Sequence, residues 1–397
     1  AYDPLVGDDS PLVVDYTFAT GADSVEAVIP LSDLGLTLGQ SVGFSAFQEG
    51  ASDGWSVDWV ESTVVTLSQD TKVDMTLETL FAGNAYGFEI QVMDDGDTKV
   101  DAASVSVSVD GASVEASVAQ ANGVTLITGQ NPALLPEETA HTVSLTLDAG
   151  GAAQSKDFVF IVGKYTHLPE AISGGTTGEE SGFLVGVTQI SSATTLLPSV
   201  HENKAELAEK QLAGEMLDPD YEDEEVPYVN EAHEDAEEEF VVVYDTPDVI
   251  NWFEQAPGEA GNFRAGLGFE DELFPFLPGW NEVHDGVVIE IRAYLDLEAG
   301  SHKIGMNGEG GWKVSGGTDA SGILVGVYDN SEIEQIPTYY PLDQYVDIVV
   351  TKAGLYPIRV LWFQSRHNKA PGMQLELFTV KDRAKHLIND LNDPKAI

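Results

Sequence analysis

Carboxylates are the side chains that could do most of the chemistry in this chain. Aspartate and glutamate make up 67 of its 397 residues. They gather at two places, an expected turn with Asp94, Asp95 and Asp97 and a run with Asp218, Asp220, Glu222 and Asp223. Oxygen ligands of this kind suit Ca²⁺. The sequence leaves two interpretations open for each place, a solvated acidic turn or a calcium site.

The second run does not have the pattern of an EF-hand loop, because no glycine stands at the sixth position and no fixed glutamate closes it. It opens a longer stretch, residues 218–239, that holds 12 acids and no Lys or Arg. Calcium is the cofactor that these carboxylates suggest. If the ions are bound, a chelator should lower the melting temperature by several degrees, since a ligand of the folded state stabilises it.

Tryptophan side chains are the second group of interest, because their large rings suit both protein cores and binding surfaces. Trp55 and Trp59 point to the same face of one expected strand. They form either part of a sandwich core or an aromatic platform for sugar rings or a partner. The same comparison applies to Trp252, Trp280, Trp312 and Trp362, the last of which lies in an alternating pattern that favours the core.

No motif predicts a catalytic site. The sequence holds no GxxxxGK[ST], no GxGxxG after a strand, no HExxH and no nucleophile elbow. Its eight histidines are scattered, and the absence of cysteine excludes disulfides, thiolate zinc sites and cysteine nucleophiles. Any two of the 67 acids could be offered as a glycosidase pair, so the sequence identifies none. We predict a non-enzymatic protein with no catalytic residues.

The charge balance bounds the partners and the environment. The formal net charge is −49, with only 18 Lys and Arg residues. This excludes nucleic acid as a partner and argues against docking on anionic membranes. No apolar run approaches the roughly 20 residues that span a bilayer. Such a surface stays soluble in saline water, so we expect an extracellular or cell-surface location. The start AYDPLVGDD, without Met, predicts processing from a longer precursor.

Alternating patterns predict an all-β fold of serial β-sandwich domains that would position these residues. Residues 1–62 contain four strand patterns, Leu12–Phe18, Val25–Pro30, Val42–Phe47 and Trp55–Val60. Four strands leave one apolar face uncovered, so this stretch is expected to be part of a larger sandwich. AVIPLSDLGLTLGQSVGFSAF and the opening DPLVGDD are similar to segments of family-nine-type carbohydrate-binding modules and their DOMON-like relatives.

The remaining chain divides into two further expected domains. Residues 63–163 show strand patterns about ten residues apart, are typical of a β-sandwich, and are similar to bacterial immunoglobulin-like modules. Residues 164–180 are predicted to be a linker because of a Gly/Thr cluster and Pro169. Residues 181–397 are expected to form a sandwich with an acidic insertion and a helix within His201–Leu217.

The segment from Val287 to Val380 resembles the protective-antigen-type (PA-fourteen-type) β-sandwich. AYLDLEAGSHKIGMNGEGGWKVSGG, DIVVTKAGLYPIRVLWFQ and QLELFTV carry that resemblance. Sugar-binding members hold calcium with two adjacent aspartates at a turn. Here Asn307 and Glu309 are the oxygen donors of that turn, and Trp312 follows them, so these three residues are candidate ligand-binding groups. The loss of both aspartates argues against calcium-dependent sugar binding of that kind.

Two functions from different classes follow from these observations. The first is a structural or adhesive surface protein whose copies assemble head-to-tail into a fibre. In that case the incomplete N-terminal unit would accept a strand from another copy. Light scattering that finds only monomers under every salt and calcium condition would remove this hypothesis. The alternative is a glycan-binding accessory region of a larger secreted polysaccharide-degrading protein.

Overall fold

The structure is a computed structural model of the chain. It describes the backbone of residues 17–20, 25–28, 41–49 and 57–66. It describes backbone and side chains of residues 75–95, 98–174, 181–197, 200, 202–221, 225–232, 241–246, 248–254, 261–280, 282–329, 342–364, 373–381 and 384–397, apart from the side chain of Leu342. The chain divides into two compact units, Ala1–Val162 and Gly163–Ile397.

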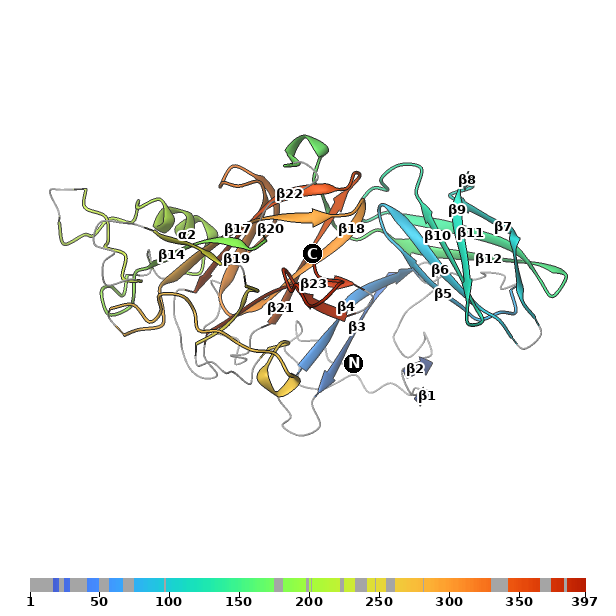
Figure 1. Cartoon of the computed structure of the whole chain (residues 1–397), viewed down its shortest axis with the longest axis horizontal. Coiled ribbons are helices and arrows are strands. Elements are labelled where there is room, and N and C mark those ends of the chain that lie inside the picture. Colours follow the sequence, from blue (N-terminus) through green and yellow to red (C-terminus); the bar gives the residue numbers. More distant parts are fainter. Residues whose placement is uncertain are drawn as a thin grey trace. The chain divides into compact units, whose positions relative to one another are not determined.

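The predicted all-β class is confirmed, since strands dominate the described residues of both units (Figure 1). The described residues of the second unit include one complete α-helix, α2 (Ala205–Leu212). In the part of the chain that the structure describes, no helix is long and apolar enough to cross a membrane.

The first unit begins with two antiparallel pairs, β1-β2 and β3-β4, and continues with two four-stranded sheets, ordered β5-β6-β10-β9 and β12-β11-β7-β8. Its strands are, in chain order, β1 (Thr17–Thr20), β2 (Val25–Val28), β3 (Ser41–Glu49), β4 (Val57–Thr66), β5 (Thr79–Gly83), β6 (Gly87–Met93), β7 (Val100–Val109), β8 (Ala112–Val114), β9 (Ala116–Ala121), β10 (Val124–Gln130), β11 (Ala140–Ala149) and β12 (Ala152–Ile161).

Two-residue turns fix the register of the hairpins in these sheets. Asp110 and Gly111 join β7 to β8, and Asn122 and Gly123 join β9 to β10. All four residues have positive φ, which the favoured hairpin turn requires and which Asp-Gly and Asn-Gly adopt with least strain. The alternation of the strands then places buried side chains between the sheets, among them Ile90, Ile127, Val143, Leu145 and Leu147.

The second unit is built from two larger sheets. One has the order β13-β21-β18-β23-β16, with β24 paired to β23, and we call it the back sheet. The other has the order β15-β14-β17-β22-β19-β20, and we call it the helix sheet. The back-sheet strands are β13 (Thr166–His167), β16 (Asn251–Phe253), β18 (Gly300–Gly308), β21 (Leu342–Val350), β23 (Gln374–Lys381) and β24 (Ala384–Leu387).

The helix-sheet strands are β14 (Phe183–Gln189), β15 (Val242–Thr246), β17 (Val287–Leu297), β19 (Gly311–Gly316), β20 (Ile323–Tyr328) and β22 (Gly354–Gln364). One large apolar cluster holds the two sheets together. In β17, Ile289 and Ile291 point into this core, so the alternation turns Glu290 and Arg292 to the other face of the sheet.

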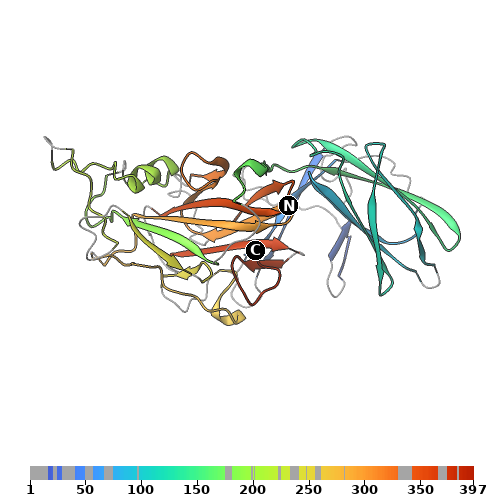
Figure 2. The same ribbon diagram turned by 45° about the horizontal axis from the view of Figure 1, so that its top comes forward.

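Helix α2 covers part of that outer face (Figure 2). Ala205 and Ala208 pack against Val288, Leu361 and Phe363 of the sheet. The helix is shorter than the predicted segment 201–217. It ends before Gly214, whose positive φ is typical of the residue that follows a helix C-terminus.

The described part of the predicted linker 164–180, residues 164–174, contributes to the second sandwich, and residues 175–180 lie outside the described residues. Strand β13 pairs in parallel with β21, and Leu168 beside it is fully buried in the core cluster. The described residues 164–174 are therefore part of the folded unit. The prediction failed because Gly, Thr and Pro mark irregular backbone but do not reveal whether a neighbouring strand pairs with it.

Candidate functional site

A cleft of about 890 Å³ lies on the outer face of the helix sheet, beside α2. Side chains from α2 and from strands β17, β19, β20 and β22 line it, together with Val241 and Val243 at β15. We call it the α2 cleft. The α2 cleft combines several charged groups with an apolar rim.

Strand register brings the charged groups of the cleft floor together. Arg292 on β17 stands directly opposite Arg359 on β22, and Glu290 precedes Arg292 by two residues on the same face. Lys313 on β19 pairs with Leu361, two residues beyond Arg359. Two arginines opposite each other repel, so this arrangement needs carboxylates between the cations.

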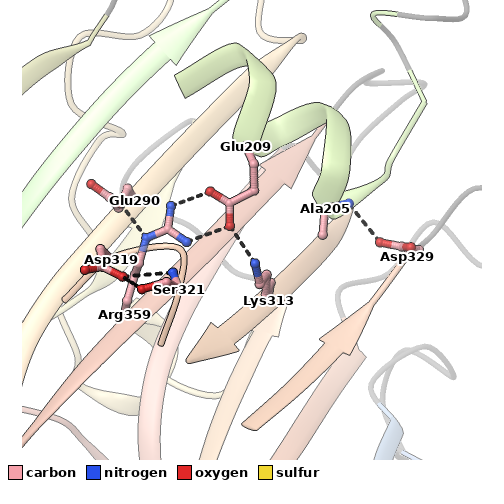
Figure 3. Close-up of polar contacts among 8 residues, drawn as sticks. All are labelled: Ala205, Glu209, Glu290, Lys313, Asp319, Ser321, Asp329 and Arg359. Atoms are coloured by element: carbon pink, nitrogen blue, oxygen red, sulfur yellow. Dashed lines mark hydrogen bonds and ion pairs between the residues drawn. The ribbon is translucent and has the colours of Figure 1, made fainter. Parts of the chain in front are cut away.

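Glu209 of α2 supplies one of those carboxylates (Figure 3). Both terminal nitrogens of Arg359 donate to Glu209, Nη1 to Oε1 and Nη2 to Oε2, each at 2.7 Å. Arg359 Nε donates to Glu290 Oε1 at 2.5 Å, and Lys313 Nζ donates to Glu209 Oε1 at 2.7 Å. A two-fold Arg–carboxylate pair of this kind is stronger and more directional than a single contact.

This network holds its charges in the ionised state. Partial burial of Glu209 raises the pKa of its carboxyl, but the hydrogen bonds from Arg359 and Lys313 outweigh burial and leave that pKa below its ordinary value. Burial likewise opposes the charge on Arg359, which is only 3% exposed, yet its bonds to Glu209 and Glu290 raise its pKa. The hydrogen bonds thus favour the charged forms of Glu209 and Arg359 on the floor of the cleft.

The same contacts fix α2 on the sheet. The backbone N–H of Ala205, at the start of the helix, donates to Asp329 Oδ1 at 2.8 Å (Figure 3). Glu209, one turn later, reaches β19 and β22 through Lys313 and Arg359. Helix and sheet are therefore tied at two points along α2.

The rim of the cleft is apolar. Val243 on one edge strand and Leu324 and Val327 on the other are about half exposed. The charged groups of the rim are already engaged, since Lys210 binds Glu206 along the helix and Asp319 accepts hydrogen bonds from the backbone and hydroxyl of Ser321. Exposed apolar side chains beside a prearranged charged floor suit a ligand that has both polar and apolar surfaces.

A second polar cluster lies on the outer face of the back sheet and is closed to solvent. Asp343, Asn307 and Glu376 are neighbours across β21, β18 and β23. The carboxylate of Glu376 accepts from the backbone N–H groups of Asn262 and Phe263, at 3.1 and 3.0 Å. Burial raises the pKa of Glu376 to about 7, against these hydrogen bonds.

Asp343 is the second carboxylate of this cluster. It accepts from Asn307 Nδ2 and Asn262 Nδ2, each at 2.7 Å, and forms an ion pair with Lys385 at 2.5 Å. Burial alone would raise its pKa, but the contact with Lys385 and the two amides leave it lowered. We interpret the cluster as a structural device that fastens the segment around Asn262 to the sheet.

The residues predicted to bind a ligand at the β18–β19 turn do not form an exposed site. Asn307 is buried and bound to Asp343, and Trp312 is 7% exposed in the main core, where its ring stacks on Tyr328. The carbonyl oxygen of Glu309 accepts from Trp362 Nε1 at 2.7 Å. This corrects the prediction for Asn307 and Trp312, because strand alternation turns Trp312 inward and neighbouring strands cover Asn307.

The structure describes little of the other predicted aromatic site, Trp55 and Trp59. Trp55 lies outside the described residues, and Trp59 is in β4 opposite Phe47, with its side chain not described. Of the remaining tryptophans, Trp252 and Trp362 are in the core, and Trp280 is half exposed. The predicted core position of Trp362 is confirmed.

Calcium binding stays a prediction. Asp97, Glu222 and Asp223 lie outside the described residues. Asp94 accepts a hydrogen bond from the N–H of Val100, and Asp218 accepts one from the N–H of Asp220. Among the residues whose side chains are described, no three His, Asp or Glu side chains converge as metal ligands. The chelator experiment therefore decides the question, and an unchanged melting curve would rule out a stabilising ion.

Comparisons with known proteins give only weak similarities. No family model and no curated protein sequence matches this chain. The epithelial adhesin 9 A domain of Candida glabrata, solved in complex with Galb1-3GlcNAc, aligns with a TM-score of 0.33 and 9% identity, covering 58% of this chain and 94% of the adhesin. A PA14 sugar-binding domain from an RTX adhesin aligns with a TM-score of 0.29 and 12% identity, covering 53% and 95%.

The PA14 domain of the MpAFP antifreeze protein aligns with a TM-score of 0.28 and 12% identity, covering 53% of this chain and 89% of that domain. Similarity at this level transfers no ligand, metal or activity to this chain. The function has to be argued from the cleft itself.

Proposed function

We propose that this chain is a non-enzymatic, extracellular saccharide-binding protein of adhesive function, and that the saccharide lies in the α2 cleft. One observation carries the proposal. The cleft joins a hydrogen-bonded floor of Arg and Glu side chains to exposed Leu324 and Val327. Planar charged groups can bond adjacent sugar hydroxyls in pairs, and apolar side chains can cover the C–H face of the ring.

The carboxylates support a binding role over glycosidase chemistry. A glycosidase needs a general acid with a raised pKa beside the substrate. In the cleft the pKa of Glu209 is lowered, and the carboxyl with the strongly raised pKa, Glu376, is fully buried on the other sheet. Neither group meets the requirement.

Three hydrogen-bonded side chains in the first unit, an Asp, a His and a Thr, are of the types found in catalytic triads. His141 Nδ1 lies 2.6 Å from Asp110 Oδ2, and His141 Nε2 lies 2.7 Å from Thr139 Oγ1. The Thr139 hydroxyl donates its hydrogen to the carbonyl of Pro136. The Thr139 hydroxyl is thus already engaged by the Pro136 carbonyl as well as by the ring of His141. This favours a structural role.

Removing the apolar rim should weaken saccharide binding. The double change Leu324→Ser and Val327→Ser reduces the apolar surface that a ligand would cover by about 50 Å². That loss corresponds to about 1.3 kcal/mol of binding free energy, or about a tenfold higher Kd. A glycan array identifies the ligand, and calorimetry with that ligand measures the change. Val159→Ser, an equally exposed strand position in the first unit, is the matched control. Equal affinity of all three proteins would place the saccharide elsewhere.

Self-assembly remains a second proposal because of one feature of the first unit. The β3–β4 and β1–β2 pairs are two-stranded sheets, and within the described residues neither pairs with a further strand. Isolated two-stranded sheets are marginally stable, so a strand from another copy would stabilise them. Light scattering of the purified chain tests this, and a monomer at every salt and calcium concentration contradicts it.

A further inference from the structure

Arg292 differs from the other cations of the α2 cleft in how it is bound. Its Nε lies 3.3 Å from Glu290 Oε2, outside hydrogen-bonding geometry, and that buried nitrogen has no hydrogen-bond partner. Among the described residues its guanidinium makes no hydrogen bond, although its side chain is only 31% exposed and lines the cleft. A guanidinium presents five donors in a fixed planar fork, and here that fork is unused.

The neighbouring cations are already committed. All three hydrogen-bonding nitrogens of Arg359 bind Glu209 and Glu290, and Lys313 binds Glu209. The floor thus sets three cations against two carboxylates. Glu290 accepts its short hydrogen bond from Arg359 and forms only a longer ion pair with Arg292, so Arg292 is the floor cation whose donors are unmatched.

The rest of the lining adds one cation, Lys210, and three carboxylates, so the whole cleft holds four cations and five carboxylates and the unmatched donors are local to Arg292. Lys210 lies between Glu206, which it binds, and Glu215, which also raises its pKa. Asp319 is satisfied by the backbone and hydroxyl of Ser321. Of the 18 Lys and Arg residues of the chain, four line this cleft, and Arg292 is the one of these whose side chain makes no hydrogen bond among the described residues.

We propose that the α2 cleft selects saccharides that carry an anionic substituent, a carboxylate or a sulfate, and that the Arg292 guanidinium binds this group. The inference rests on the proposed saccharide-binding function and names its ligand class. An anion at Arg292 accepts hydrogen bonds from guanidinium donors that no side chain of the cleft engages. The apolar rim at Leu324 and Val327 covers the ring to which the anion is attached.

The test compares matched ligands on the full chain. The probes are a hexuronate oligosaccharide, the same oligosaccharide with its carboxylates methyl-esterified, and a sulfated neutral oligosaccharide. Kd is measured by calorimetry for the wild type, Arg292→Gln and Arg292→Lys at low and high salt. We expect the wild type to prefer one or both anionic ligands over the ester by about tenfold.

We expect Arg292→Gln to lose that preference, so that it binds the anionic ligands and the neutral ester equally. Arg292→Lys should keep part of it, since charge remains but the fork is lost. Salt should weaken the preference and not the neutral binding. Equal binding of ester and anionic ligands by the wild type, or an unchanged preference in Arg292→Gln, overturns the inference. Failure to bind any of the three ligands or any saccharide on the glycan array overturns the proposed function itself.

Discussion

Replacing Arg359 by methionine should destabilise the second unit by about 3 kcal/mol, because it leaves two partly buried carboxylates without their shared cation. Arg359 is 3% exposed and binds both Glu209 and Glu290. Methionine fills much of the same space, so the loss is electrostatic rather than a cavity effect. Arg359→Lys should recover part of the stability, since it restores the charge without the two-fold geometry.

Urea unfolding followed by tryptophan fluorescence measures this effect, since four of the six tryptophans belong to the second unit. The control is Lys352→Met, which removes an exposed ion pair with Glu170 on the same unit. Such a pair contributes little, so its unfolding midpoint should stay at the wild-type value. If Arg359→Met unfolds at the same midpoint as Lys352→Met, the cleft network does not stabilise the fold.

The second large effect is a loss of stability as pH rises toward neutrality. Burial raises the pKa of Glu376 from its ordinary value of 4.5 to about 7 in the folded state. The folded protein therefore favours the protonated carboxyl. Its contribution is complete below the unfolded pKa and is lost as pH rises through 7. The raised pKa corresponds to a decrease of about 3 kcal/mol in the free energy of unfolding between about pH 4.5 and pH 7.5.

Glu376→Gln isolates this contribution, because glutamine is neutral at every pH. Asp343 and Lys385 share the buried cluster, and many other acids titrate in the same range, so the variant is compared with the wild type at each pH. The free energy of unfolding of Glu376→Gln should depend less steeply on pH by about 3 kcal/mol over this interval. Asp296→Asn, at an exposed position on β17, is the control. Parallel curves for all three proteins would contradict the prediction.

The sequence predicted local structure better than it predicted the site. Alternation predicted the all-β class, whereas the hairpin turns at Asp110-Gly111 and Asn122-Gly123 are seen only in the structure. The residues of the cleft floor were not predicted. Arg359 lies 69 residues from its partner Glu290 in the sequence, and Glu209 lies 150 residues from Arg359. Only strand register and helix docking bring them together.

The sequence also failed to predict which side chains are buried. Trp312 has the size and position of a sugar platform beside the β18–β19 turn, yet its strand parity turns it into the core. In the same way, Leu168 looked like part of a linker and is buried completely. Both errors arise because burial depends on which sheet faces a residue, and sequence pattern gives only the alternation within its own strand.

Glu209 belongs at the same time to the helix and to the floor of the cleft. Any local opening that lifts α2 from the sheet removes that carboxylate, frees Arg359 and Lys313, and abolishes the cleft as a binding surface. Occupancy of the cleft and docking of the helix are thus linked equilibria. A ligand that fits the closed form slows the exchange of α2 amide hydrogens with solvent in proportion to how tightly it binds.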